Sequence, residues 1–74
     1  MIYWPAVVGA MQRRRWAARL ERAAPERLTV AAAADILHVE RARFLEFLRS
    51  RLGLAVGLAS EVSRDSLVTA LRGT

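Results

Sequence analysis

The chain has 74 residues and a net charge of +5, and all twelve of its basic residues are arginine. This length suffices for one small domain with a modest core, and much of the 54% hydrophobic content is alanine, which buries little area per residue. Cysteine is absent, which excludes disulfides and thiolate metal sites.

The excess of arginine has two interpretations. Arginine suits phosphate recognition because its planar guanidinium donates hydrogen bonds in pairs and never deprotonates. A GC-rich genome also enriches arginine, alanine, leucine and valine together, and all four are frequent here. The arginine content alone therefore does not indicate a nucleic-acid partner.

Residues 1–26 form the first of two expected regions, an apolar and basic helical segment. Met1–Met11 is apolar and is followed by Arg13–Arg15. A secretory signal carries its positive charge before the apolar stretch, and a bilayer span needs about 20 apolar residues. A membrane partner is therefore not expected. A helix is expected from Arg15 onward, and Pro25 ends it.

Three interpretations of this segment remain open. The favoured one is that its large apolar residues supply core or a partner-binding, self-association surface: Tyr3, Trp4, Val7, Val8, Met11, Trp16 and Leu20. In the second, Arg13, Arg14 and Arg15 form a basic arm that contacts DNA phosphates. The third is an interfacial membrane anchor, which is disfavoured because charged and apolar residues do not separate around one helix. The amount of apolar surface points to a protein partner or a homo-oligomer.

The second region, residues 27–74, begins with the pattern of a helix-turn-helix. The apolar residues of a first helix follow the i, i+3, i+4, i+7 rule: Val30, Ala33, Ala34 and Leu37. A tight break at residues 37–39 separates them from a second helix over residues 40–52. The apolar stripe of that second helix consists of Phe44, Phe47 and Leu48. This spacing is that of a helix pair whose second helix can enter a DNA major groove.

The end of the chain predicts a wing and a last helix. Alternation in residues 54–58 indicates a short strand, with a turn near residues 59–60 and a second strand over residues 61–63. Ser63 is a suitable N-cap for a helix over Arg64–Arg72, which Gly73 closes. Alternatively, residues 54–58 stay helical or looped, and the domain is all-α.

From residue 28 to residue 73 the chain resembles the excisionase and MerR-like group of winged helix-turn-helix proteins. The resemblance rests on Leu-Thr-Val-Ala-Ala-Ala-Ala-Asp-Ile-Leu-His-Val-Glu-Arg at residues 28–41 and on Val-Ser-Arg-Asp-Ser-Leu at residues 62–67. It implies a small DNA-binding regulator or antitoxin. The chain departs from the family pattern with His38 for the turn glycine, Glu40 for the capping serine, and no arginine in residues 57–61.

Docking of the second helix in DNA would use its outward arc of Ala42, Arg43, Glu46, Arg49 and Ser50, with Arg41 near the first turn. Residues at the start of a recognition helix reach deepest, so Arg41 and Arg43 are the candidates for base edges and Arg49 for a phosphate. The alternative is a solvated face with local ion pairs, in which Glu46 pairs with Arg43 or Arg49, and Arg41 pairs near Glu40.

The distribution of charge favours a different function. Residues 1–27 hold six arginines against two glutamates, whereas residues 28–74 hold six arginines against five acidic residues. A DNA-binding domain usually concentrates positive charge on its docking face. The nearly neutral second region therefore keeps open a protein-interaction module, which binds a partner through the N-terminal segment without DNA.

The sequence carries no constellation for catalysis. With a single histidine, His38, the usual metal clusters and nucleophile–base pairs cannot be assembled. No metal, cofactor or small-molecule substrate is expected. We expect a mainly α, cytoplasmic helix-turn-helix protein with a short β-hairpin wing and an extra N-terminal helix in one compact unit, and this protein is expected to bind double-stranded DNA.

Overall fold

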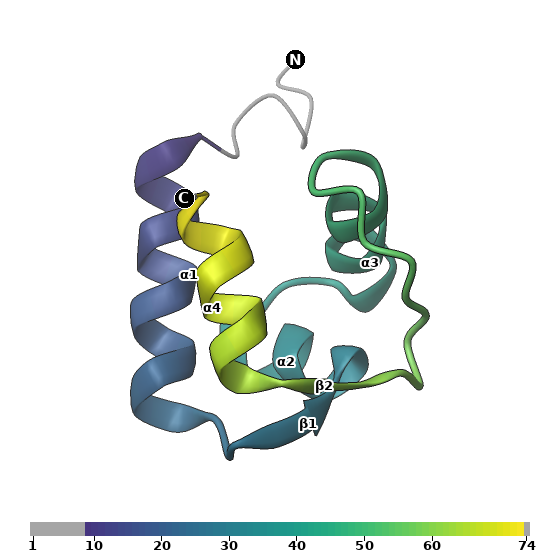
Figure 1. Cartoon of the computed structure of the whole chain (residues 1–74), viewed down its shortest axis with the longest axis horizontal. Helices are drawn as coiled ribbons and strands as arrows, with labels where there is room; N and C mark the ends of the chain where they lie inside the picture. Colours follow the sequence, from purple (N-terminus) through teal and green to yellow (C-terminus); the bar gives the residue numbers. More distant parts are fainter. Residues whose placement is uncertain (1–8, 74) are drawn as a thin grey trace.

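The computed structural model of the chain describes residues 9–73, which form four helices and two short strands. In chain order these are α1 (Ala10–Ala23), β1 (Arg27–Thr29), α2 (Val30–Leu37), α3 (Arg41–Ser50), β2 (Glu61–Ser63) and α4 (Arg64–Arg72). Helices α1 and α4 lie side by side, α3 lies across the molecule from them, and the strands run below α2 (Figure 1). The expected fold class, mainly helical with a small antiparallel pair of strands, is confirmed.

A single apolar core draws on all four of these helices. It consists of Trp16, Ala17, Leu20, Ala24, Leu28, Val30, Ala33, Ala34, Leu37, Phe44, Phe47, Leu48, Leu67, Val68 and Leu71. The Trp16 indole meets Phe44 and Phe47 edge to face, with ring centroids 5.6 and 5.5 Å apart. Such aromatic pairs stabilise a fold by more than the burial of their apolar area alone. Helix α1 is therefore fixed to α3 through the core.

Some of the residues that were expected to bind a partner are buried in this core. Trp16 is 5% exposed and Leu20 is fully buried. Of the two expected roles, core or partner surface, both side chains therefore have the first, and their assignment to a partner-binding surface was wrong. Met11 lies outside the core and is 69% exposed. Tyr3, Trp4 and Val7, the other members of the expected surface, lie outside the described residues.

The first amides of α2 donate hydrogen bonds to a capping side chain and to a loop distant in sequence. The Thr29 hydroxyl accepts a hydrogen bond from the amide of Ala32 at 3.1 Å. The amides of Val30 and Ala31 donate to the carbonyls of Ser60 and Leu58, both at 3.0 Å. Three of the four amides that an α-helix leaves without an internal partner are thus satisfied.

The break after α2 occurs at His38, as expected. His38 has φ 59° and ψ 39°, the left-handed conformation that often ends a helix. Its amide donates to the carbonyl of Asp35 and the amide of Val39 donates to that of Ala34. These bonds satisfy the last carbonyls of α2 and reverse the chain into α3.

The prediction of a hairpin wing is wrong for its first strand. Residues 54–58 form no strand, and β2 pairs instead with β1, with Leu28 opposite Val62. The alternating residues Leu54, Val56 and Leu58 are all half-buried against the core. Their backbone serves other partners: the amide of Leu54 donates to Leu48, and the Leu58 carbonyl accepts from α2.

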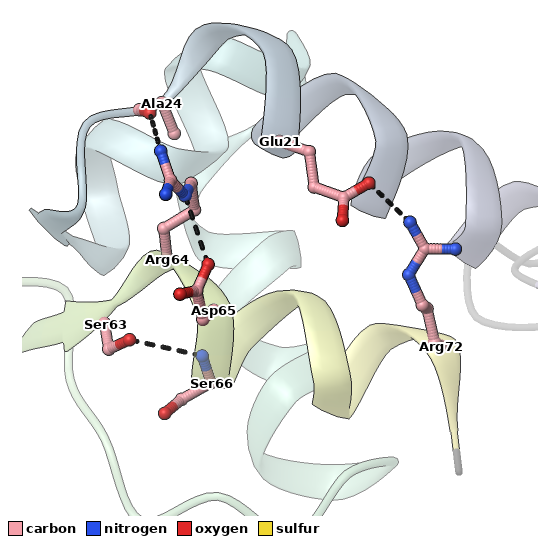
Figure 2. A network of polar contacts seen from close by, with 7 residues as sticks. All are labelled: Glu21, Ala24, Ser63, Arg64, Asp65, Ser66 and Arg72. Atoms are coloured by element: carbon pink, nitrogen blue, oxygen red, sulfur yellow. Dashed lines mark hydrogen bonds and ion pairs between the residues drawn. The ribbon is translucent and has the colours of Figure 1, made fainter.

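Helix α4 is attached to α1 by polar contacts at both of its ends (Figure 2). Ser63 caps α4 by accepting from the amide of Ser66 at 3.3 Å, and Gly73 ends it at φ 68°, both as expected. Arg64 donates to the Ala24 carbonyl at 3.1 Å, and Arg72 pairs with Glu21.

We expect His38→Val to lower the free energy of unfolding by about 1–2 kcal/mol, because a β-branched residue is poorly tolerated in the left-handed conformation. His38→Gly is the matched control and should stay within about 1 kcal/mol of the wild type, since glycine tolerates this backbone but adds entropy to the unfolded chain. Urea denaturation followed by circular dichroism measures both. Equal stability of the two variants would contradict the assignment.

Candidate nucleic-acid interface

Helix α3 presents one apolar and one polar face. Phe44, Phe47 and Leu48 hold the apolar face in the core. The polar face is exposed along its whole length and consists of Arg41, Ala42, Arg43, Glu46, Arg49 and Ser50. The outward arc expected for this helix is therefore the arc that faces solvent. The Ser50 hydroxyl donates to the Glu46 carbonyl at 2.7 Å.

Arg41 is held by a carboxylate from the preceding helix. Its Nε and Nη2 donate to the two oxygens of Asp35 at 3.0 and 2.6 Å, a bidentate pair in which both side chains are about half exposed. The hydrogen bonds from Arg41 are the largest cause that holds the pKa of Asp35 below its usual value of 3.8; desolvation opposes them, and the charge of Arg41 adds a smaller lowering effect. The pair connects the last turn of α2 to the first turn of α3.

Arg43 is also engaged with a carboxylate. Its Nε donates to Glu40 Oε1 at 3.1 Å. The expected partners were different: Glu46 was expected to pair with Arg43 or Arg49, and Arg41 to pair near Glu40. The Asp35–Arg41 pair follows from the chain reversal at His38, which brings the two residues together at a sequence separation that no helical spacing predicts. The Glu40–Arg43 pair has the i,i+3 spacing of a helix start.

Arg49 differs from the two arginines at the start of α3. It lies in the last turn, is exposed, and forms no ion pair with any residue that the structure describes. A cation at this end of a helix complements the helix dipole. Its guanidinium remains accessible for the phosphate contact that was expected of it.

The three arginines expected to form a basic arm are part of α1 and separate into two groups. Arg13 is turned toward α4: its Nε is buried without a hydrogen-bond partner, and a Cβ added at Gly73 would lie 3.1 Å from its Nη2. This orientation separates Arg13 from Arg14 and Arg15, and a contact of Arg13 with DNA stays a prediction. Arg14 and Arg15 are exposed.

Two further arginines of α1 were not identified from the sequence. Arg19 donates from Nε to the Ile36 carbonyl at 2.9 Å, at the end of α2. Arg22 is exposed one turn further along α1. Together with Arg15 they follow the i, i+4, i+7 spacing of one helix face, and this spacing was the signal that could have found them.

Comparison of the chain with protein families, with curated proteins and with solved structures gives no match. The resemblance to the excisionase and MerR-like group stays a prediction that rests on residues 28–41 and 62–67. Among residues 9–73, no helix has the length and apolar character needed to cross a membrane. The same residues include no group of three or more histidine or acidic side chains placed to hold a metal ion.

The Asp35–Arg41 pair predicts a specific dependence of stability on pH. Because the pKa of Asp35 is lowered by folding, its contribution is present above the unfolded value of 3.8 and is lost as the pH falls through the folded value. The unfolding free energy of the wild type should therefore begin to approach that of Asp35→Asn as the pH falls below about 4, and the two should meet only below the folded pKa of Asp35. Urea denaturation across a pH series measures the difference. Arg41→Gln should remove the same dependence, and parallel curves for wild type and Asp35→Asn would contradict it.

Proposed function

We propose that this protein is a small DNA-binding regulator or antitoxin that inserts α3, within the expected recognition helix of residues 40–52, into the major groove of double-stranded DNA. The observation that carries the proposal is the exposed polar face of α3, which presents three arginines while its opposite face is fixed in the core. A rigid helix with an exposed face that carries arginine is the element that such proteins use for recognition. A cytoplasmic location is part of this proposal.

The residues of α3 would have separate roles in the complex. Arg41 and Arg43, at the start of the helix, would approach the base edges, where arginine pairs bidentately with guanine. Arg49, at the other end, would contact a phosphate. Asp35 and Glu40 hold the first two guanidiniums in the free protein. Binding would exchange these carboxylates for guanine or phosphate oxygens.

The alternative is a protein-interaction module that binds no DNA. The carboxylates of Asp35 and Glu40 at the start of α3 favour it, because they place negative charge where phosphates would approach. Exposed Met11 at the start of α1 also favours it as a point of contact for a partner or a second copy. The two functions differ in whether the wild-type chain binds a DNA duplex at all.

We expect Arg41→Ala and Arg43→Ala each to weaken specific DNA binding by about 1–3 kcal/mol, because each removes a base contact. Fluorescence anisotropy with a duplex taken from upstream of the chain's own gene measures the loss across a salt titration. Arg27→Ala is the matched control, since it removes an exposed, ion-paired arginine from β1. Equal affinity of the wild type and all three variants would contradict the recognition-helix assignment.

Removal of the competing carboxylates should have the opposite effect. We expect Asp35→Asn and Glu40→Gln to tighten DNA binding roughly two- to fivefold each, because an exposed ion pair contributes at most about 1 kcal/mol and its loss frees a guanidinium. Glu61→Gln is the control of equal charge change, since Glu61 pairs with Arg27 on the sheet. A gain in affinity as large in Glu61→Gln as in the other two would show a general charge effect and contradict release of the arginines.

A further inference from the structure

The face of α1 beside the end of α2 carries a shallow groove lined by arginine. Two depressions meet there and share Arg19 and Arg22; Arg15 lines the first, and Asp35 and His38 line the second. We call this surface the basic groove and define it by Arg15, Arg19 and Arg22. Because the three side chains follow the i, i+4, i+7 spacing, they form one row along α1.

The positive charge of the basic groove is not cancelled by its neighbours. Arg15 and Arg22 form no ion pair with the described part of the chain. Asp35 is the only carboxylate among the lining residues described, and it is occupied by Arg41. Glu21, adjacent to Arg22 in the sequence, is directed instead to Arg72 of α4 (Figure 2).

Three carbonyls at the end of α2, which would otherwise present partial negative charge to the groove, accept hydrogen bonds. The Ile36 carbonyl accepts from Arg19, and those of Ala34 and Asp35 accept from the amides of Val39 and His38. The hydrogen bond to Ile36 also holds the Arg19 side chain across the groove. The groove is thus a positively charged surface in which a hydrogen bond fixes the position of the middle arginine, Arg19.

The basic groove is continuous with the first turn of α3. Asp35 lines the groove and also binds Arg41, so the two surfaces meet at this ion pair. The row from Arg15 to Arg22 rises about 10 Å along α1, which corresponds to about three nucleotides of one DNA strand along its axis. One strand could therefore follow the groove while α3 enters the adjacent major groove.

We propose that the basic groove binds the phosphate backbone of the same DNA duplex that α3 reads. This inference rests on the proposed function and adds to it a second contact surface, made by a helix outside the helix-turn-helix pair. Arg13 is excluded because it faces α4. Arg14 is exposed on α1 but lines neither depression, so it contributes no contact.

The occupant is a nucleic-acid backbone and not an anionic membrane surface. A helix that lies on a membrane needs an exposed apolar face next to its basic face. The large apolar residues of α1 within the described range, Trp16 and Leu20, are buried in the core. Met11 is exposed but lies outside the residues that line the groove.

The test compares the salt dependence of DNA binding for Arg15→Gln, Arg22→Gln and their double variant with that for Arg14→Gln, the control on the same helix. The slope of log affinity against log salt should become shallower by about 0.9 for each groove arginine removed. This corresponds to roughly five- to tenfold weaker binding at about 0.1 M salt for each single variant. The loss should be the same on a random-sequence duplex, because phosphates carry no sequence information.

The outcomes separate this inference from the proposed function. If the wild type binds DNA but the groove variants and Arg14→Gln show the same slope of log affinity against log salt, the groove does not contact DNA. The proposal that α3 binds the major groove would then still stand. Absence of DNA binding by the wild type would overturn both proposals. Binding of the wild type to vesicles containing phosphatidylserine, lost in the double variant and without any DNA binding, would assign the groove to a membrane instead.

Discussion

The edge-to-face packing of Trp16 against Phe44 and Phe47 is the contact on which the arrangement of this small protein depends. It joins the helix that carries most of the unpaired arginines to the helix proposed to read DNA. Among the residues described, the core contains three aromatic side chains, and these three join α1 to α3. Any role for the two helices on one ligand requires that this orientation be fixed.

The arginines of the described chain fall into two groups, those that pair with a carboxylate and those that do not. Those at the start of α3 are held by Asp35 and Glu40. Arg27 joins the two strands through Glu61, Arg72 joins α4 to α1 through Glu21, and Arg64 pairs with its neighbour Asp65 within α4. The arginines that form no ion pair in the described chain are Arg13, Arg14, Arg15, Arg19 and Arg22 on α1 and Arg49 on α3; of these, Arg19 donates to the Ile36 carbonyl and Arg13 is turned toward α4. The uneven charge of the two regions, which argued against DNA binding, is equally consistent with a docking surface that includes α1.

Helix periodicity and caps were predictable from local sequence, whereas contacts across the chain were not. The buried face of α2, the left-handed His38, the Ser63 cap and the Gly73 end follow from spacing and backbone preference. The pairing of β1 with β2 does not, because three-residue strands carry little pattern and their register depends on the helices between them. The same holds for the candidate site. The hydrogen bond from Arg19 to the Ile36 carbonyl and the orientation of Arg13 toward α4 depend on how α1 packs, so local sequence could not predict them.

The pairing of α1 with α4 also affects how the chain reaches its native state. Because the earliest and latest helices described here pack along each other, their contacts join residues about 50 positions apart. During synthesis α1 leaves the ribosome well before Leu67, Val68 and Leu71 can cover it. The core is therefore complete only after α4 has been made, and contacts between residues so far apart in the sequence form more slowly than local ones.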